Sequence, residues 1–571
     1  MGRQASATIL MPDCSCNALG QGPVWGNAMA SGPLDCYIGR VIGGHHMSIV
    51  IARGAEACSV LGDSAFREAW AALYTNCPWR SVFQSPAFVS TWYRVYKPAF
   101  EPILLFRKMP SGDLAGFLPL ALARDDGALQ VAGAPQAEYQ AWLARSEDRS
   151  FIGDALAALR GSGMTGQLAF TYLPPDTPLD WTEVAPWRQV CEIEPWSRPL
   201  RAIGEDAGAS LKKKSNKSRL NRLARIGPVR FERVSERVAL EEIIEQIELA
   251  YDLRQAAVHG GRPFREDLLK REFHLALLEQ PDVLHVTVLW AGDRLLAAHI
   301  GAADRNFVHN GIIAFDLFDA GLSPGKLHQL LMFQDMAKEG IAFFDLTPGD
   351  DPWKERFATE HQTVHRLTLH DSAWHKRAAL SKRFAKDLAR KLLAAVGLDP
   401  RALKARFAAE RGEEPIVLLR AAAGTAAKAP GADILAVDCL EDLVAYEPGS
   451  GGKSVQRFAR EATSRLEQGQ RVFTAQRAGC LAFCGWLIER PAKSPITAAE
   501  GRLEHPPGRV VLRLDDVTPD ATDPEQTKAG LAQMLRAAAA VEGARDVLVV
   551  IPARASQARA VAAALGLEAV G

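Results

Sequence analysis

The stretch FVHNGIIAFDLFDAGLSPGKLHQLLMFQDMAKEGIAFFDLTPGDDPWKERF, residues 307–357, decides the fold. Its pattern predicts a strand over 307–316, a loop, a helix over 326–338 and a second strand over 341–348. The loop AGLSPG, residues 320–325, precedes the helix N-terminus, where unsatisfied backbone N–H groups and partial positive charge favour a phosphate group. This order of elements predicts a phosphate-binding loop between two strands of a mixed sheet.

The loop and the start of the helix offer several candidate phosphate ligands. Gly321 and Gly325 would let the backbone approach a ligand closely, and Ser323 can cap the helix or donate to a phosphate. Lys326 and His328 add donors nearby. An ordinary capped loop between strand and helix is the alternative, and the loop alone does not separate the two.

The same order of strands and helices recurs along the chain. Residues 47–204, 205–372 and 416–571 each follow it, and a Lys/Arg/Ala-rich segment over 373–415 is predicted to be a helical linker. Residues 1–46 lack sustained periodicity and are predicted to form a disordered leader. The predicted fold class is therefore mixed α/β, with sheets flanked by helices in tandem related domains.

Composition limits the classes of function. The 571 residues include 67 Lys and Arg and 67 Asp and Glu, and this zero net charge argues against general affinity for nucleic acid or membrane. The nine cysteines form no CxxC pair and no zinc-spaced cluster, so no metal is expected. The apolar runs are shorter than the roughly 20 residues that span a bilayer, and no signal peptide is evident. These features predict a cytoplasmic protein without membrane insertion or DNA binding.

One local patch departs from this neutrality. Seven basic residues and no acidic residue fall between Lys212 and Arg225. If this segment is helical, Leu220, Leu223 and Ile226 form a narrow apolar stripe beneath a basic face. Three uses of that face remain open: a solvated surface, binding of a CoA 3′-phosphate or another anionic substrate, and RNA binding.

The ordered set of segments resembles the CelD-like (BcsL-like) acetyltransferases, a GNAT-superfamily branch linked to cellulose and exopolysaccharide formation. The matching features are SPG, the pattern D-L-x-x-G-x-x-x-W-K-x-x-F from Asp345, the basic start LKKKSNKSRLNRLARIGPVRFE, Arg254 in AYDLRQ, and VLWAGDRLLAAHIGA. VFQSPAFVSTWY and FLPLAL resemble the family's N-terminal half. The resemblance covers about residues 60–372.

This resemblance implies acyl transfer from acyl-CoA, with acetyl-CoA as the donor, to the nitrogen or oxygen of a polar small-molecule or saccharide acceptor. It places acyl-CoA where two parallel strands splay, with the pyrophosphate on residues 321–326. In this superfamily an amine or hydroxyl attacks the thioester while a base takes a proton, so catalysis is mostly positioning. The usual Q/R-x-x-G-x-G/A signature is replaced here by GLSPGK, so phosphate contacts do not transfer one for one.

Charged residues near the second strand are candidates for the chemistry. They are Asp345, Asp350, Asp351, His309, Lys354 and Arg254. The acids and the histidine are candidate bases or acceptor ligands, whereas the two cations suit an anionic acceptor or developing charge. Each has a structural alternative: a strand cap for Asp345, a hydrogen-bonded core histidine for His309, and surface charges for the cations. Trp353 is expected to pack or to stack on a ligand.

The third domain also resembles GNAT domains, through LRLDDVTPDATDPEQTKAGLAQML and the closing DVLVVIPARASQARAVAAALGLE. Asp523, Pro524 and Glu525 stand where glycines and a basic residue are wanted. Each acid would repel a pyrophosphate by about 1 kcal/mol if partly buried. The domain is therefore predicted to be degenerate, acting as scaffold or acceptor-binding module.

Two other functions suit the same features. Fem-type peptidyl transferases share the tandem GNAT plan and take aminoacyl-tRNA, although residues 205–372 lack the long helical-hairpin insertion that many of them carry. A non-catalytic adaptor of a polysaccharide-synthesis complex would use the same folds as interaction modules.

Overall fold

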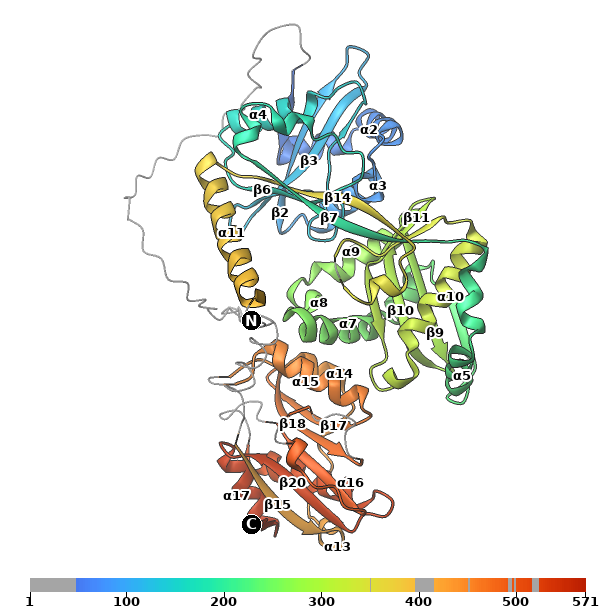
Figure 1. Ribbon diagram of the computed structural model, residues 1–571, viewed down its shortest axis with the longest axis vertical. Coiled ribbons are helices and arrows are strands. Elements are labelled where there is room, and N and C mark those ends of the chain that lie inside the picture. The colour runs from blue at the N-terminus through green and yellow to red at the C-terminus, as the bar shows by residue number, and fades with distance from the viewer. Residues whose placement is uncertain are drawn as a thin grey trace, which may run out of the picture. The chain divides into compact units, whose positions relative to one another are not determined.

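The computed structural model describes residues 48–349, 351–395, 415–449, 452–490, 496–497, 500–515 and 523–570. The predicted leader, Asp350 and part of the predicted linker lie outside these residues. The described chain has the mixed α/β fold that the sequence predicts, with four sheets and flanking helices (Figure 1).

The first sheet is antiparallel and belongs to the N-terminal part of the chain. Its strands are β1 (Val50–Arg53), β2 (Phe100–Lys108), β3 (Leu114–Ala123), β4 (Leu129–Val131) and β5 (Leu143–Ala144). The accompanying helices are α1 (Ala55–Gly62), α2 (Ser64–Asn76), α3 (Pro86–Val95) and α4 (Phe151–Gly161). Phe106 lies opposite Phe117 across the β2–β3 pair, and both rings contact Phe66 of α2. The β2–β3 hairpin thus provides one wall of an aromatic core.

The second sheet combines strands from distant parts of the sequence. Its order is β11 (Phe307–His309), β13 (Phe343–Asp345), β7 (Cys191–Ala202), β14 (Glu360–Leu369) and β6 (Leu168–Leu173). Strand β14 is antiparallel to β7 along its whole length and also pairs with β6. This sheet takes strands from both sides of the predicted boundary between residues 204 and 205. The domain boundary itself remains a prediction.

The third sheet carries the other half of the predicted strand over 307–316. Its order is β12 (Ile312–Phe315), β10 (Arg294–Ala302), β9 (Leu284–Ala291) and β8 (Val229–Arg233), all antiparallel. The predicted single strand is therefore divided at Asn310 and Gly311: its first part belongs to the second sheet and its last part to the third.

Helices around these two sheets begin and end at recognisable signals. They are α5 (Lys214–Leu223), α6 (Arg237–Glu241), α7 (Ile244–His259), α8 (Pro263–Glu266), α9 (Leu269–Leu278), α10 (Pro324–Glu339) and α11 (Ala373–Ala395), with 3₁₀ turns η5 (Ala320–Leu322) and η6 (Lys354–Arg356). Gly260 and Gly340 follow α7 and α10 with φ of 88° and 74°, a left-handed conformation that glycine adopts without strain.

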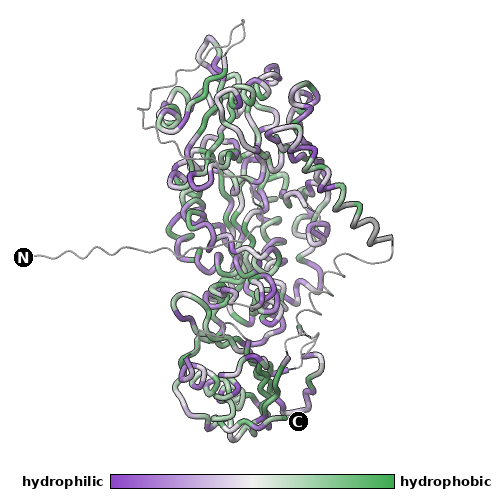
Figure 2. Tube along the Cα trace, turned by 90° about the vertical axis from the view of Figure 1, so that its left-hand side faces the viewer, coloured by the Kyte–Doolittle hydropathy of each residue, from purple (hydrophilic) through white to green (hydrophobic). Residues whose placement is uncertain are grey.

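The C-terminal sheet has the order β16 (Ala436–Val437), β17 (Arg471–Arg477), β18 (Cys480–Ile488), β19 (Arg509–Leu514), β20 (Asp546–Pro552), β15 (Ile416–Ala422) and β21 (Glu568–Ala569). Helices α13 (Ala423–Ala426), α14 (Leu440–Val444), α15 (Val455–Glu467), α16 (Pro524–Ala539) and α17 (Ser556–Ala564) accompany it. Its central strands are among the strongly hydrophobic segments near the C-terminus in Figure 2. Strands β19 and β20 stay paired in parallel from Arg509 opposite Asp546 to Arg513 opposite Val550.

Helix α7 packs against the C-terminal part. Arg262, just after α7, donates to the carbonyl oxygens of Val444 and Tyr446 at 2.9 Å each, and its guanidinium pairs with Glu447 at 2.9 Å. Leu253 on α7 belongs to the same apolar cluster as Val444. Hydrogen bonds and apolar packing thus join the region of this helix to α14 and the residues that follow α14. None of the described helices is both long and apolar enough to cross a membrane.

Candidate active site

Two parallel strands separate at the point where the sequence predicts acyl-CoA. Strands β11 and β13 pair in parallel up to His309 opposite Asp345, and the amide of Asn310 donates to the carbonyl oxygen of Asp345 at 2.8 Å. Strand β12 then pairs with β10, where Ile312 lies opposite Ile300. The parallel pairing therefore ends at His309 and Asp345, and the two strands diverge beyond them.

A cavity of about 150 Å³ lies beside this divergence. Its walls include Phe83, Glu138, Tyr251, Lys270, His309 and Gly311. The first two come from the N-terminal part, the next two from α7 and α9, and the last two from the dividing strand. The candidate site therefore extends beyond the predicted range of residues 205–372.

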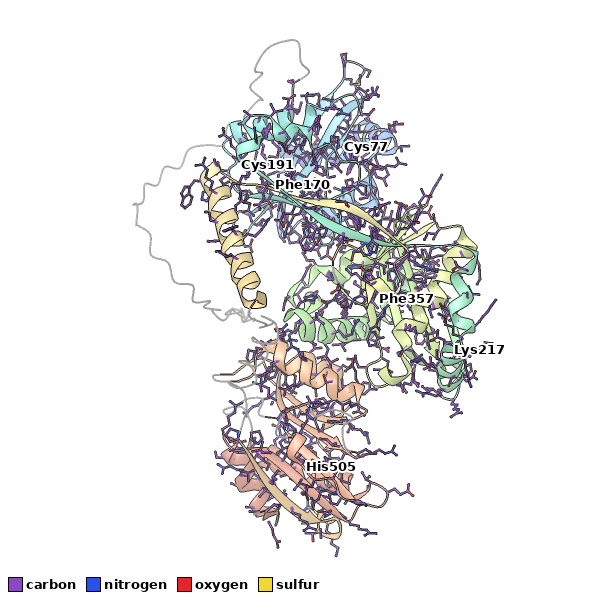
Figure 3. The ribbon with its side chains drawn as sticks, viewed as in Figure 1. Cys77, Phe170, Cys191, Lys217, Phe357 and His505 are labelled. Atoms are coloured by element: carbon purple, nitrogen blue, oxygen red, sulfur yellow. The ribbon has the colours of Figure 1, made fainter. Side chains whose placement is uncertain are left out.

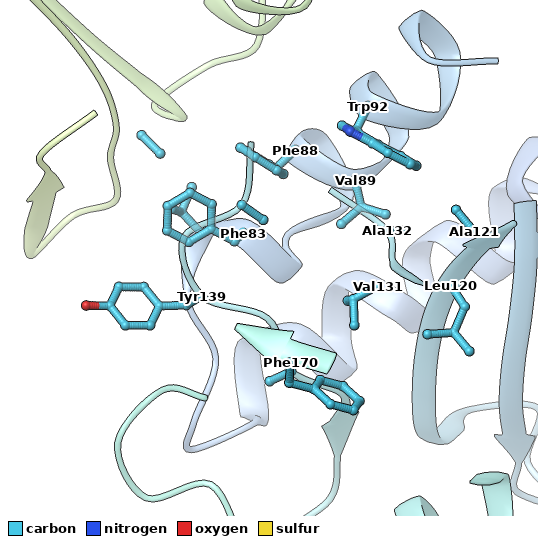
Figure 4. Close-up of a cluster of buried hydrophobic side chains, with 14 of the residues drawn as sticks. Phe83, Phe88, Val89, Trp92, Leu120, Ala121, Val131, Ala132, Tyr139 and Phe170 are labelled. Carbon is cyan, nitrogen blue, oxygen red and sulfur yellow. The ribbon is translucent and has the colours of Figure 1, made fainter. Parts of the chain in front are cut away.

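Asp345 organises a buried cluster next to the cavity. Its Oδ2 accepts hydrogen bonds from Tyr139 Oη at 2.8 Å and from Arg198 Nε at 2.9 Å, and its Oδ1 accepts from the Thr347 amide at 2.8 Å. The Tyr139 hydroxyl points out of the apolar cluster formed by Phe83 and its neighbours (Figure 4). Burial alone would raise the pKa of Asp345, but the Arg198 charge and the hydrogen bond to His309 outweigh it and hold the pKa well below its usual range.

An ionised Asp345 determines which nitrogen of His309 carries a proton. His309 Nδ1 lies 3.1 Å from Asp345 Oδ2, and a carboxylate can only accept a hydrogen bond. When the ring is neutral, its proton is therefore on Nδ1, and Nε2 keeps its lone pair. Among the described residues, this buried Nε2 has no hydrogen-bond partner. Asp345, with none of its surface exposed, thus positions His309 and Arg198 rather than meeting a substrate.

Glu138 is the side chain in the cavity wall that is best suited to accept a proton. Burial and, to a lesser extent, the Asp345 charge raise its pKa to about 7 against the opposing charge of Lys354. A carboxyl with a pKa near 7 exchanges a proton readily at neutral pH. Across the cavity, burial lowers the pKa of Lys270 to about 8, and its ammonium donates to Gln136 Oε1 at 2.7 Å.

The remaining predicted catalytic residues have structural contacts. Lys354 is buried and donates to the carbonyl oxygens of Thr347 and Pro348 at 3.2 and 3.1 Å, so it braces the loop after β13. Asp351 is exposed and pairs with the same ammonium at 3.3 Å. Arg254 donates to the Ile313 carbonyl oxygen at 2.8 Å and stacks over the Phe315 ring. Trp353 packs edge-on against Phe357. Asp350 lies outside the described residues.

The predicted phosphate loop leads into the N-terminus of α10. Ser323 has φ of 55° and its side chain makes no capping hydrogen bond, so the hydroxyl is available to a ligand. A Cβ added at Gly321 would have no protein atom within 4 Å, so the space beside this glycine is open, and its predicted close approach to a ligand stays a prediction. His328, by contrast, was expected beside the loop but is buried and hydrogen-bonded to Thr287, and burial lowers its pKa to about 4.

Cations surround the start of α10. Burial lowers the pKa of Lys326, and the nearby charges of Arg219, Lys213 and Arg356 lower it further. Such mutual repulsion is relieved when an anion binds among the cations. Arg222 Nη2 also donates to the Gly321 carbonyl oxygen at 3.4 Å, which ties α5 to the loop.

The basic helix α5 has a second, outward side. Lys217, labelled in Figure 3, belongs to a basic hollow of about 530 Å³. The hollow is lined by Lys212, Lys214, Lys217, Ser218, Asn221, Arg222 and Arg225. The predicted apolar stripe of this segment is confirmed, because Leu223 is buried and Leu220 and Ile226 pack beside it.

Replacing Gly325 with Ala tests the geometry of this loop. An added Cβ would lie 2.9 Å from the Phe315 ring. Another neighbour of this ring is the Arg254 guanidinium, whose carbon lies 4.2 Å from the ring centroid. We expect Gly325→Ala to lower the free energy of unfolding by about 1–3 kcal/mol, because this overpacking displaces the ring. Gly321→Ala is the matched control and should change it by less than about 0.5 kcal/mol. Urea denaturation compares the two, and equal midpoints would contradict the packing argument.

Comparison with known families agrees with this position of the site. Residues 211–355 match the acetyltransferase (GNAT) domain family. The matched segment contains β11, the loop before α10, α10 and β13, but not Glu138 or Arg198. Among curated proteins, no sequence matches the chain.

Solved structures resemble the chain only distantly. A conserved protein of unknown function from Bacteroides thetaiotaomicron is 10% identical with a TM-score of 0.38, covering 54% of this chain and 97% of its own. FemX is 11% identical with a TM-score of 0.36, and the match covers 53% of this chain and 95% of FemX. A tandem GNAT protein from the clavulanic acid biosynthesis pathway is 12% identical with a TM-score of 0.34. The match covers 56% of this chain and 98% of that protein. Likeness at this level carries over no substrate or activity to this chain.

Sequence reasoning missed the residues that the N-terminal part contributes. Glu138 stands in GAPQAEYQAW, a short segment where it is the one charged residue among apolar and amide neighbours. A lone acid in such a segment is a usable signal of a buried carboxyl. Arg198 lies in EPWSRPLRA, where two prolines obscure the strand pattern.

Proposed function

We propose that the protein transfers an acyl group from acyl-CoA, with acetyl-CoA as the donor, to the nitrogen or oxygen of a polar acceptor. One observation carries this proposal: β11 and β13 diverge at His309 and Asp345 in front of the N-terminus of α10, within the segment that matches the GNAT domain. A sheet opened in this way offers backbone groups to a pantetheine chain, and the helix terminus offers N–H groups to a pyrophosphate.

The loop supplies groups suited to the phosphates of the donor. The Ser323 hydroxyl makes no capping bond, and the first-turn amides of Gly325 and Lys326 have no helical carbonyl to bond. The Lys326 ammonium, together with Lys213 and Arg219, supplies positive charge at the same helix end. Hydrogen bonds from charged groups to phosphate are stronger than those between neutral groups. These residues are therefore the proposed binding site for the acyl donor.

The cavity beside the strands is the proposed acceptor site. An acceptor amine or hydroxyl attacks the thioester carbonyl, so that the new acyl–nitrogen or acyl–oxygen bond forms as the acyl–sulfur bond breaks. Glu138 takes the acceptor's proton and returns it to the leaving thiolate, which its pKa of about 7 permits. Asp345 and Arg198 keep His309 in place beside it.

Finer assignments belong to the same proposal. The resemblance to CelD-like acetyltransferases supports a saccharide acceptor and a link to cellulose or exopolysaccharide formation. The start of α16 supports a degenerate third domain, since Asp523 caps this helix and Glu525 lies in its first turn, where a pyrophosphate would meet like charge. The basic hollow on α5 supports aminoacyl transfer from charged tRNA as the second candidate function.

Isothermal titration with acetyl-CoA tests the donor site. We expect binding that weakens about ten-fold or more in Lys326→Glu, because a carboxylate replaces a cation at the helix N-terminus, with the loss greatest at low salt. Lys97→Glu is the control, since Lys97 is an exposed lysine outside the site. If the folded wild-type protein does not bind acetyl-CoA, then acetyl-CoA is excluded as the acyl donor. If the same titration with bulk tRNA then gave salt-sensitive binding, the second candidate would be favoured.

A further inference from the structure

Helix α11 exposes large apolar side chains to solvent. Trp374 and Phe384 are each 71% exposed, Leu388 is 46% exposed and Leu380 is 41% exposed. Exposed side chains of this size on one helix are unfavourable in water and are typical of an interaction surface. The helix directly follows β14 and is labelled in Figure 1.

These four side chains lie on one face of the helix. At 100° per residue, Leu380, Phe384, Leu388 and Trp374 fall within an arc of about 120°. The small residues Ala378 and Ala385 lie next to that arc. An arc of this width is typical of an amphipathic helix that buries its apolar face.

The protein holds α11 by a polar face that lies beside this arc. Arg383 pairs with Glu192 at 2.8 Å and also with Glu194, both on β7. Lys376 Nζ donates to the Arg188 carbonyl oxygen at 2.8 Å. Both cations lie about 180° from Trp374 around the helix axis. They also lie about 40–60° beyond Leu380, at the other edge of the arc. The helix is therefore attached through charges beside the arc, and the four apolar side chains stay exposed.

The charges on α11 indicate which partner this face meets. The sequence over 373–395 contains one acid, Asp387, and seven basic residues, which are Lys376, Arg377, Lys382, Arg383, Lys386, Arg390 and Lys391. Arg377 lies within the apolar arc, and both Arg377 and Lys382 are exposed. Long cationic side chains beside apolar ones reach lipid phosphates while tryptophan, phenylalanine and leucine enter the acyl boundary.

We propose that α11 docks the protein on the surface of a membrane that contains anionic lipids. The apolar arc enters the interface, Arg377 and Lys382 contact the headgroups, and β7 stays on the aqueous side. A helix that lies on a membrane does not need to cross it. RNA would leave the apolar arc uncovered, and a second copy of the helix would bring like charges together. The inference rests on α11 alone and is independent of acyl transfer.

Vesicle co-sedimentation of the full chain tests this proposal. We expect binding to mixed phosphatidylcholine–phosphatidylglycerol vesicles, much weaker binding to pure phosphatidylcholine, and loss of binding as salt rises. The double variant Trp374→Ala/Phe384→Ala should weaken partitioning by about ten-fold or more, because both rings leave the interface. Leu268→Ala is the matched control, because Leu268 is an exposed apolar residue, 84% accessible, on another surface.

Circular dichroism and an unchanged urea-unfolding midpoint establish that the variants are folded. The proposal is overturned if the folded wild type binds neither kind of vesicle, or if the double variant binds as tightly as the wild type. It is also overturned if binding to neutral vesicles is equally strong. Self-association that disappears in the double variant, without vesicle binding, would assign the face to a second copy of this chain instead.

Discussion

Asp345→Asn lowers the free energy of unfolding by about 3–5 kcal/mol at pH 7, because it leaves the buried Arg198 guanidinium without its counter-charge. The amide also cannot accept from Tyr139, Arg198 and His309 as strongly as a carboxylate does. Urea denaturation measures the change. Asp351→Asn is the matched control, since that acid is 57% exposed and its loss should cost less than about 1 kcal/mol.

The effect of Asp345 depends on pH in a definite direction. Its pKa is lower in the folded protein than the reference value of about 3.9 in the unfolded chain. The stabilisation is therefore fully present above about pH 4 and is lost as pH falls below it. The gap between wild type and Asp345→Asn should narrow on acidification. A gap that stays constant from pH 7 down to about pH 3 would mean that this ion pair does not carry the effect.

Glu138→Gln lowers kcat by about 10²- to 10⁴-fold, the usual loss when a general base is removed. Acetyl-CoA affinity should change little, because the base lies in the acceptor cavity. In the wild type, kcat/KM should rise with pH through about 7, as the carboxyl loses its proton. Acceptor-dependent release of the CoA thiol, measured across a panel of amines and saccharides, gives both values. Glu147→Gln is the control, since that acid is exposed.

The same substitution should stabilise the fold above neutral pH. Because the pKa of Glu138 is raised to about 7, the folded protein binds this proton better than the unfolded chain does. Stability therefore declines as pH rises from about 4.3 to about 7, and a neutral glutamine avoids that decline. We expect a gain of about 1–2 kcal/mol at pH 8, allowing for partial exposure of the side chain. A variant that lost activity and stability together would instead point to a structural role.

Local patterns in the sequence sufficed for most of the fold. Helix α3 begins at its Ser-Pro signal, and its cap is present: Ser85 Oγ accepts from the Phe88 amide at 3.2 Å. The hairpin β2–β3 and strands β9 and β10 follow their apolar patterns for the same reason, since their interactions are close in sequence. Strands β7 and β14 escaped recognition because prolines and charges interrupt them and their pairing spans more than 150 residues.

The candidate site also contains residues that the sequence could predict and residues that it could not. The loop before α10 and the residues around Asp345 were predictable because one continuous segment contains them. Glu138 and Arg198 were not, since only tertiary packing brings them to β13. The spacing of residues in the sequence also does not reveal the contacts of Lys354 and Arg254. The Lys354 ammonium donates to two backbone carbonyl oxygens, and the Arg254 guanidinium covers the Phe315 ring.

The position of β14 between β6 and β7 has a consequence for synthesis on the ribosome. In the described part of the chain, β6 pairs with β14 alone, so its edge stays open until Leu369 has emerged. After Ala202 is made, that wait is about 170 residues, or about 8–30 s at 5–20 residues per second. An unpaired strand edge exposed for that long is a template for wrong pairing. Nascent chains stalled between these two points should therefore be the species that most need a chaperone.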